Sequence, residues 1–443
     1  MKRVIYLPYF ENKKATVLGL GLLGRGVGDT EFLLEAGADV ICTDTRSEEK
    51  LKESIAQIKN GKHTNLKLVI GENRMEDFEN RDFVLTCPGM PLGYEYLEHA
   101  KSNNIPIFMS ASLLSDIVMK NLPNVTIIGV TGTRGKSTTT QMIAHILKSA
   151  NSRVHLGGNI RGIANLPLLK EIEDDEYLLL ELDSWQLQGF GDQKISPHIA
   201  VFTNFMDDHM NYYKNDKELY FNDKANVYRY QKDLDVLIVS EEAAEEIKKR
   251  DENQEMVLAS NSYIETSLLG EHNQTAAKLA YEVASQCGID DETIREAIKT
   301  FKAVDGRLED LGEFRGVRIF NDNNGTTPNA TMAGIKAIVE TYNRKPVLIM
   351  GGSDKGLPIE ELENVIKENT KEVIYLSGTG TERMTLPKKY EFEELKDCIG
   401  KAFEVAEQGD IILFSPAFAS FSKYFSNEYE KNDEFVKLVQ KYA

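Results

Sequence analysis

The sequence predicts an α/β protein of two or three domains built on parallel sheets. Short β-rich segments alternate with helical patterns along the whole chain, as in parallel sheets whose strands are joined by helices. The chain has 443 residues, more than the roughly 250 to 300 at which one hydrophobic core stops growing. The strand pattern occurs in segments 15–20, 39–44, 83–88, 125–130, 177–182, 199–205, 235–240, 346–352, 372–378 and 410–417.

Two changes of pattern mark domain boundaries. The first lies near residue 106, where the segment 103–122 interrupts the early strand candidates. The second lies near residue 303, where two helical patterns, 273–287 and 291–301, give way to new strand signals. We therefore expect three domains over residues 1–106, 107–303 and 304–443.

Charge and cysteine usage exclude several classes of protein. Lysine and arginine total 52 against 70 acidic residues, a net charge of −18, which repels nucleic acid and anionic membrane surfaces. The four cysteines lie far apart, so we expect neither a zinc site nor a disulfide framework. No segment reaches the roughly 18 apolar residues of a membrane span, and the N-terminus lacks the apolar core of a signal peptide. We expect a protein of the reducing cytoplasm with no nucleic-acid partner and no membrane insertion.

Residues 129–138, GVTGTRGKST, predict a phosphate-binding loop between a strand and a helix. Its glycines let backbone N–H groups approach phosphate oxygens, Lys136 can neutralise the β- and γ-phosphates, and the Ser137 hydroxyl suits Mg²⁺. Val130 stands where the common pattern has its first glycine, so Gly132 must shape the turn. The loop indicates a protein that handles ATP.

Two further glycine loops follow strand candidates. Gly19, Gly21 and Gly24 have the spacing of a dinucleotide-binding loop, and Asp44 ends the next strand about 20 residues on. On this loop alone, an NAD-dependent oxidoreductase is an alternative, but it leaves the phosphate loop unexplained. The later loop, 351–356, either binds a ligand or forms a plain tight turn.

Polar side chains also follow the strands of the central segment. Glu181 ends one strand candidate, His209 and two aspartates follow the next, and Lys224 lies beyond them. If these strands neighbour the phosphate-loop strand, their carboxyl ends converge on a triphosphate, and Glu181 becomes an oxygen ligand for Mg²⁺. Taken singly, His209 would be a packed or surface histidine and Lys224 an ordinary surface lysine.

Ten motifs in order make the chain resemble the Mur ligases over essentially its whole length. They are GVTGTRGKST, LGGNIRG, LLELDSWQLQ, TNFMDDHMNYY, NDKANVY, GEHNQTAA, GRLE, FNDNNGTTPNAT, GGSDKG and FSPAFASFSKYF. The resemblance implies three domains: a Rossmann-like N-terminal domain for a UDP portion, a central P-loop ATPase domain with a parallel sheet, and a Rossmann-like C-terminal domain for an amino acid.

The resemblance also implies an activity in peptidoglycan precursor assembly. An ATP-dependent ligase of this branch joins D-glutamate to UDP-N-acetylmuramoyl-L-alanine through an acyl phosphate, and we expect it to act as a monomer. The alternatives are a sibling ligase that adds another amino acid and an inactive nucleotide-binding regulator.

Site residues follow from the same resemblance. The UDP substrate would meet Gly21, Leu22, Asp44, Thr45 and Arg46, with Asn159 at its carboxylate end. ATP would meet Gly132, Thr133, Arg134, Gly135, Lys136, Ser137 and Thr138, together with Asn273, Arg307 and Asp322. Two Mg²⁺ ions would be held by Ser137, Glu181, His209 and a carbamylated Lys224, and the catalytic set would be Lys136, Asn159, Glu181, His209 and Lys224. D-Glutamate would meet Thr326, Lys355, Ser420 and Phe421.

Five positions depart from the pattern of these ligases. Asn324 stands where a lysine is usual, Asp183 where a serine follows Glu-Leu, and Leu23 where a threonine is common. The first removes a cation from a dicarboxylate site and the second adds an anion near the substrate. Ser422 and Asn432 also differ from the usual C-terminal pattern.

Overall fold

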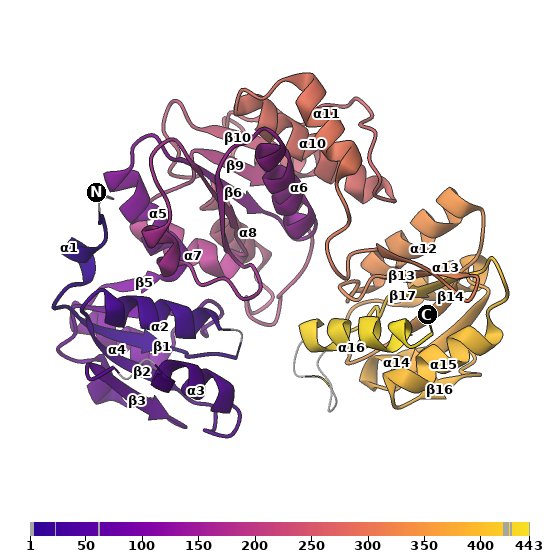
Figure 1. Ribbon diagram of the computed structural model, residues 1–443, viewed down its shortest axis with the longest axis horizontal. Coiled ribbons are helices and arrows are strands. Elements are labelled where there is room, and N and C mark those ends of the chain that lie inside the picture. The colour runs from indigo at the N-terminus through magenta and orange to yellow at the C-terminus, as the bar shows by residue number, and fades with distance from the viewer. Residues whose placement is uncertain (1–3, 23, 61–62, 420–424, 426–427, 443) are drawn as a thin grey trace. The chain divides into compact units, whose positions relative to one another are not determined.

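The computed structural model describes residues 4–22, 24–60, 63–419, 425 and 428–442. The chain folds into two compact units: Met1–Ser262 with Lys278–Ile294, and Tyr263–Ala277 with Arg295–Ala443. The first unit holds two sheets and the second holds one, each flanked by helices (Figure 1). The predicted α/β class with three parallel-sheet domains is confirmed, while the boundaries near residues 106 and 303 stay predictions.

The first sheet has five parallel strands in the order β3-β2-β1-β4-β5. They are β1 (Lys14–Leu18), β2 (Asp39–Asp44), β3 (Leu66–Ile70), β4 (Phe83–Thr86) and β5 (Ile107–Met109). Its helices are α1 (Leu7–Phe10), α2 (Arg25–Glu35), α3 (Lys52–Asn60), η1 (Met75–Phe78) and α4 (Glu95–Ser102). All four residues of β4 are buried. Because neighbouring strand residues point to opposite faces, both faces of the sheet are covered.

The second sheet has six parallel strands in the order β11-β10-β9-β6-β8-β7. They are β6 (Thr126–Thr131), β7 (Val154–Gly158), β8 (Tyr177–Glu181), β9 (Ile199–Phe202), β10 (Val236–Val239) and β11 (Val257–Leu258). The helices of this segment are α5 (Ser110–Asn121), α6 (Lys136–Ser149), η2 (Leu166–Lys170), α7 (Ser184–Gln193), α8 (Lys217–Ala225), α9 (Glu241–Lys248), α10 (Glu271–Gln286) and α11 (Asp291–Thr300). The central position of β6 brings the loops after β8 and β9 beside the loop that β6 carries.

The third sheet has the order β12-β13-β17-β14-β15-β16. Its strands are β12 (Glu309–Phe314), β13 (Val317–Asn321), β14 (Val347–Gly351), β15 (Glu372–Leu376), β16 (Glu391–Phe392) and β17 (Ile411–Phe414). Its helices are α12 (Pro328–Tyr342), α13 (Glu360–Asn369), α14 (Thr379–Arg383), α15 (Leu395–Val405) and α16 (Glu428–Gln440). β12 pairs antiparallel with β13, a departure from the purely parallel expectation. The two-residue turn at Arg315 and Gly316, both with positive φ, makes this hairpin.

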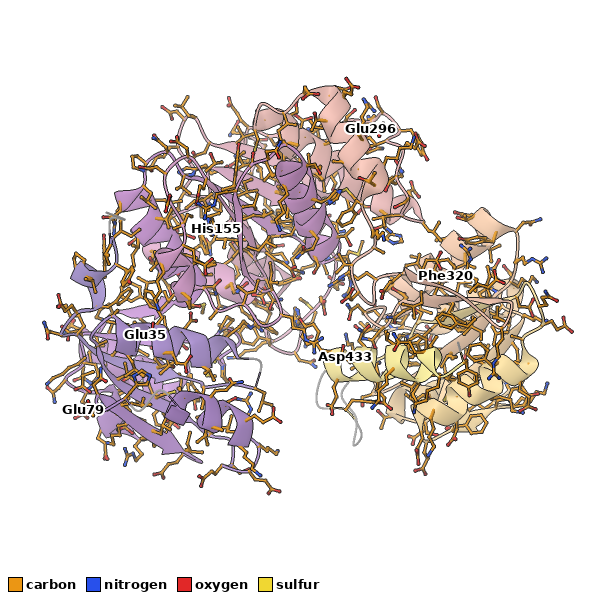
Figure 2. The ribbon with its side chains drawn as sticks, in the orientation of Figure 1. Glu35, Glu79, His155, Glu296, Phe320 and Asp433 are labelled. Carbon is orange, nitrogen blue, oxygen red and sulfur yellow. The ribbon has the colours of Figure 1, made fainter. Side chains whose placement is uncertain are left out.

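Apolar cores lie against each sheet, and charged side chains line the outside. Phe320 of β13 is 1% exposed in the core of the third sheet, whereas Glu296 of α11 is exposed (both labelled in Figure 2). Among the described residues, none of the helices has the length and apolar character needed to cross a bilayer.

Candidate functional site

The predicted phosphate loop joins the end of β6 to the start of α6. The first N–H groups of α6, as of any helix, have no intrahelical acceptor. Gly135 precedes them in a left-handed conformation and provides no side-chain cap. A Cβ on Gly132 would lie 1.9 Å from the Thr203 hydroxyl, and only glycine fits there. The N–H groups of the first turn of α6, at the positive end of the helix dipole, suit an anion such as phosphate.

The segment after β9 fixes the shape of this loop. Asn204 accepts the N–H of Thr133 on its backbone carbonyl at 3.0 Å and the N–H of Arg134 on its side-chain oxygen at 2.8 Å. The Thr133 hydroxyl accepts the N–H of Met206 at 3.0 Å. The loop is therefore preorganised by side-chain and backbone groups of the segment that follows β9.

Two lysines converge on one carbonyl of the loop. Lys136 donates from Nζ to the carbonyls of Gly132 and Thr133 at 3.0 and 3.1 Å, and Lys224 of α8 donates to the same Gly132 carbonyl at 2.7 Å. Lys224 is 1% exposed, with its Nζ 4.9 Å from the centroid of the Tyr220 ring. Burial, and then the charge of Lys136, lower the pKa of Lys224 well below the usual lysine range.

Glu181 ends β8, the strand beside β6, which carries the phosphate loop. It is in register with Val130 of β6 and Gly158 of β7, and it is 5% exposed. Its backbone carbonyl accepts the N–H of Asn159 at 2.7 Å. Glu181 and Asn159 therefore meet at the carboxyl ends of β7 and β8, and the Glu181 carboxylate and the Ser137 hydroxyl are hard oxygen donors of the kind Mg²⁺ uses.

His209 occupies a strained position in the loop after β9. Its φ of 55° is left-handed, which is uncommon outside glycine, and its ring centroid lies 4.5 Å from that of Trp185. Burial lowers the pKa of His209, so the neutral imidazole, which can bind a metal, is favoured. Among the described residues, no three His, Cys, Asp or Glu side chains cluster in a way that could hold a metal ion.

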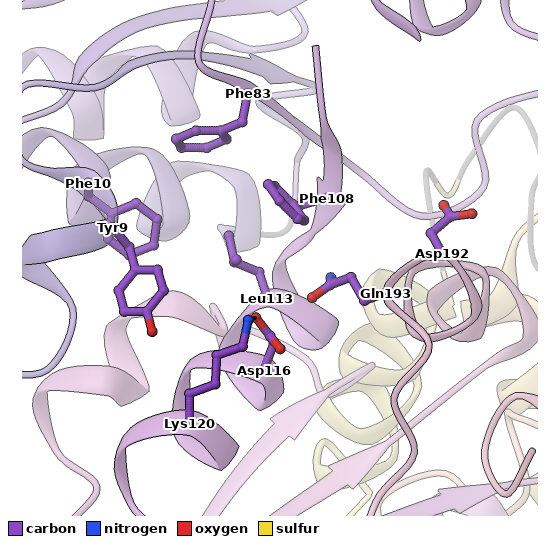
Figure 3. A pocket seen from close by; sticks show the side chains of 9 residues that line it. All are labelled: Tyr9, Phe10, Phe83, Phe108, Leu113, Asp116, Lys120, Asp192 and Gln193. Carbon is purple, nitrogen blue, oxygen red and sulfur yellow. Dashed lines mark hydrogen bonds and ion pairs between the residues drawn. The ribbon is translucent and has the colours of Figure 1, made fainter. Parts of the chain in front are cut away.

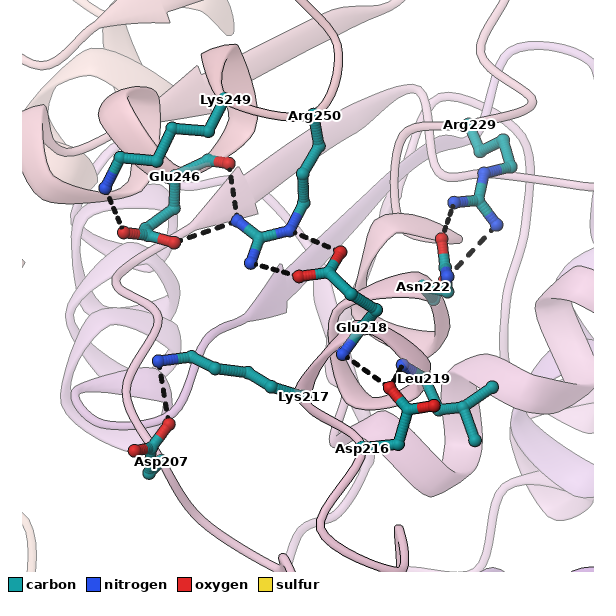
Figure 4. A network of polar contacts seen from close by, with 10 residues as sticks. All are labelled: Asp207, Asp216, Lys217, Glu218, Leu219, Asn222, Arg229, Glu246, Lys249 and Arg250. Atoms are coloured by element: carbon teal, nitrogen blue, oxygen red, sulfur yellow. Dashed lines mark hydrogen bonds and ion pairs between the residues drawn. The ribbon is translucent and has the colours of Figure 1, made fainter.

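A network of charged side chains holds the start of α8, the helix that carries Lys224 (Figure 4). Lys217 pairs with Asp207 of the β9 loop at 2.8 Å. Arg250 pairs with Glu218 of α8 at 2.7 Å and with Glu246 of α9 at 2.8 Å. These contacts tie α8 to the loop that bears His209 and to the next helix.

The first glycine loop is closed by the carboxylate of Asp44. This carboxylate accepts the N–H of Gly21 at 3.0 Å and the N–H of Arg46 at 2.9 Å, and the Arg46 guanidinium pairs with it at 3.1 Å. Thr45 and Leu22 are exposed beside it. The structure therefore brings the five predicted residues of the UDP site together around one carboxylate.

Arg25, which the sequence analysis did not single out, joins this loop to the central sheet. It is the first residue of α2, and its Nη1 donates to Oδ1 of Asn159 at 2.8 Å. No motif pointed to it, because a single arginine after a glycine loop has no distinctive spacing.

The remaining predicted residues belong to the second unit. Lys355 donates to the Thr326 hydroxyl at 3.1 Å, so these two are brought together. Asp322 accepts from Ser415 at 2.7 Å, and burial raises its pKa to about 7 while the nearby charge of Arg307 opposes the shift. The Asn273 amide donates to the Leu269 carbonyl at 2.7 Å.

Some of the predicted residues lie outside the described part of the chain: Ser420, Phe421, Ser422 and Leu23. Of the described departures, Asp183 is the N-cap of α7, where its carboxylate accepts the N–H of Gln186 in a capping box. Asn324 lies in the β13–α12 loop, where its backbone N–H donates to Gly306 at 2.9 Å.

A cavity of about 390 Å³ lies elsewhere in the first unit, and Figure 3 shows the side chains that line it. Four of its nine lining residues are aromatic and four are polar or charged, and among the latter Asp116 and Lys120 pair at 2.6 Å. None of the predicted site residues lines it.

Three family models match the chain in order. They describe a Mur ligase MurD-like N-terminal domain over residues 13–109, a Mur ligase middle domain over 130–279, and a Mur ligase glutamate ligase domain over 306–418. Together they cover most of the chain.

Curated relatives match over nearly their full length. The chain is 32% identical to the UDP-N-acetylmuramoylalanine–D-glutamate ligase of Borreliella afzelii, over 98% of this chain and 99% of that protein. It is 29% identical to the protein of the same name from Roseiflexus, over 97% and 99%.

Solved structures share the fold. The UDP-N-acetylmuramate-alanine ligase MurC of Thermotoga maritima has a TM-score of 0.63 at 17% identity, over 98% of this chain and 100% of that chain. The MurF ligase of the same organism, solved in complex with ADP, has a TM-score of 0.62 at 16% identity over the whole of both chains.

Proposed function

The chain belongs to the Mur ligase family, and on that basis we propose that it joins D-glutamate to UDP-N-acetylmuramoyl-L-alanine with ATP in peptidoglycan precursor assembly. The reaction begins when the substrate carboxylate attacks the γ-phosphorus, giving an acyl phosphate and ADP. The amine of D-glutamate then attacks the acyl carbon, and the tetrahedral intermediate collapses with loss of phosphate. We place the enzyme in the cytoplasm as a monomer.

One observation carries the proposal: Lys136 and Lys224 meet at the Gly132 carbonyl. The first chemical step brings two anions together, the carboxylate and the triphosphate, so the positive charge of Lys136 is needed there. The lowered pKa of the neighbouring Lys224 favours its neutral amine, which suits it to modification rather than to charge neutralisation. Lys136 and the N–H groups at the start of α6 would bind the β- and γ-phosphates, while Asn159 would orient the carboxylate.

We propose that two Mg²⁺ ions bind at Ser137, Glu181, His209 and Lys224. The donor set fits this metal only if Lys224 supplies an oxygen, because an amine is not a ligand that Mg²⁺ favours. The lowered pKa favours the neutral amine, the form that adds CO₂ to give a carbamate. The ions would neutralise charge on the phosphoryl group during transfer.

We propose that five further residues contact the ATP and amino-acid substrates. Asn273 would contact the adenine ring, and Arg307 and Asp322 the γ-phosphate and the ribose. The Lys355 and Thr326 pair would meet the carboxylates of D-glutamate, since an ammonium and a hydroxyl both donate to carboxylate oxygens. Asn324 is neutral and adds no cation there.

Phosphate release from Mg²⁺-ATP with UDP-N-acetylmuramoyl-L-alanine tests the proposal. We expect release with D-glutamate and not with L-glutamate, lysine or diaminopimelate. Lys136→Ala should lower the rate by about 100-fold or more, the scale of losing one electrostatic contact to a transition state.

Lys148→Ala is the matched control, because Lys148 lies in the last turn of the same helix, α6. Release with a different amino acid would assign a sibling ligase. No release with any of them would refute the proposed reaction.

A further inference from the structure

Arg25 and Asn159 meet although 134 residues separate them in the chain. Arg25 follows the first glycine loop at the start of α2, and Asn159 follows β7 next to the Glu181 carbonyl. The bond thus links the loop predicted to bind the nucleotide with the residue predicted to hold the substrate carboxylate.

The chemistry of the two groups fixes the orientation of Asn159. A guanidinium has five N–H donors and no acceptor, so the asparagine must turn its carbonyl oxygen toward Arg25. The NH₂ group, which carries two donors, then faces the opposite way. A carboxylate accepts hydrogen bonds and cannot donate them, so this is the orientation of Asn159 that suits a carboxylate ligand.

The position of Arg25 also favours an anionic neighbour. A cation at the first residue of a helix lies at the positive end of the helix dipole, which is unfavourable without a nearby anion. Within the described ranges of the chain, no carboxylate forms an ion pair with Arg25, whose bonding partner is the neutral Asn159 amide. Asp29 of the same helix attracts Arg25, and a carboxylate held by Asn159 would add negative charge beyond the amide without contacting Arg25.

A second residue of α2 anchors the segment that bears Asn159. Asp29, one helical turn after Arg25, accepts the backbone N–H of Leu166 at 2.8 Å. The Asn165 side chain accepts the N–H of Gly158 at 2.7 Å. These hydrogen bonds hold the segment 158–166 at both ends and keep Asn159 beside Arg25.

We propose that Arg25 is a positioning residue for the carboxylate of the nucleotide substrate, acting by orienting the amide of Asn159. This inference rests on the proposed function, because it assigns Asn159 to that carboxylate. It predicts that loss of Arg25 weakens use of the nucleotide substrate and leaves use of ATP intact.

Steady-state kinetics with Arg25→Gln and Arg25→Lys test the role. Glutamine is shorter and neutral and can donate or accept, so it no longer fixes the Asn159 amide, whereas lysine only donates. For Arg25→Gln we expect kcat/KM for the nucleotide substrate to fall about 10- to 100-fold, the scale of a charge-assisted hydrogen bond, with KM for ATP unchanged. Arg25→Lys should retain most of the activity.

A double-mutant cycle separates this role from a general structural one. If Arg25 acts through Asn159, the double variant with Arg25→Gln and Asn159→Ala should have a kcat/KM less than about threefold below that of Asn159→Ala alone. Arg318→Ala is the control, because Arg318 forms an exposed ion pair in the second unit. Thermal unfolding of each variant checks that the fold is kept.

Additive losses in the cycle, or wild-type kinetics for Arg25→Gln, would overturn the inference while the proposed function stands. A rise in KM for ATP equal to that for the nucleotide substrate would also overturn it. An inactive wild-type enzyme would refute the proposed function, and this inference with it.

Discussion

Lys136 and Lys224 donate to the same carbonyl oxygen, so two ammonium groups would lie close together in a buried place. The arrangement is costly while both are charged, and it is relieved when Lys224 loses its proton. A carbamate on Lys224 would go further, because it replaces a repelled cation with an anion beside Lys136. The repulsion between the two ammonium groups therefore favours carbamylation of Lys224.

We predict that ligase activity depends on dissolved CO₂. Activity should fall about tenfold or more in CO₂-free buffer, the usual scale for disturbing a metal site, and return when bicarbonate is added at constant pH. With ¹³C-labelled bicarbonate, the wild type should show a carbamate carbon resonance that Lys224→Arg lacks. Full activity without CO₂, or the same resonance in the variant, would contradict the prediction.

Helix α7 shows why one departure from the family pattern is tolerated at the scale of an element. Asp183 lies two residues after the end of β8 and caps α7, with Gln186 completing a capping box. Serine is also a favourable N-cap residue, so either residue type starts the helix. The added negative charge is accepted because it lies at the positive end of the helix dipole.

We predict that Asp183→Ala destabilises the first unit by about 1 kcal/mol, the usual value of an N-cap. Asp183→Ser should change the free energy of unfolding by less than about 0.5 kcal/mol, because the hydroxyl can accept the same N–H. Urea unfolding followed by circular dichroism measures both. Equal losses in the two variants would show that the carboxylate does more than cap the helix.

At the scale of the whole molecule, each unit contains a buried carboxylic acid with a raised pKa. Burial raises the pKa of Asp29 in the first unit to about 6 and that of Asp322 in the second to about 7. Each folded unit therefore holds a proton that the unfolded chain releases at lower pH. Stability from these groups is greatest below the unfolded value of about 3.9 and declines as pH rises toward the folded value.

The free energy of unfolding of the second unit should fall as pH rises and Asp322 loses its proton. We predict that Asp322→Asn, which cannot ionise, abolishes this fall. The wild type should lose stability relative to the variant as pH rises from about 4 to about 7, by on the order of 4 kcal/mol in total. Hydrogen exchange of peptides from β13 and β14 at several pH values measures the difference. Parallel curves for the two proteins would mean that Asp322 is not protonated in the fold.

Much of the fold could be predicted from pattern, and the limits have physical causes. Each of the ten predicted strand segments contains a strand, because buried parallel strands are continuous apolar runs. β11 and β16 have two residues each, too few for a pattern. The hairpin of β12 and β13 depends on the turn at Arg315 rather than on any apolar run.

The candidate site was harder to predict from residues than the fold. Lys224 taken alone resembled a surface lysine, yet the structure buries it against the Gly132 carbonyl, 92 residues away in the chain. Such a contact depends on how β6 and α8 pack, which local sequence does not encode. The metal-binding and substrate-binding roles stay predictions.

The second unit is assembled from two separate stretches of chain, Tyr263–Ala277 and Arg295–Ala443. A gene exchange between relatives that replaced only the codons after residue 295 would leave the shorter stretch with its old sequence. Leu269 from that stretch packs against the core beside β13 and β14, so a mismatched pair would be poorly packed. Recombination within such a gene should therefore inherit both stretches together.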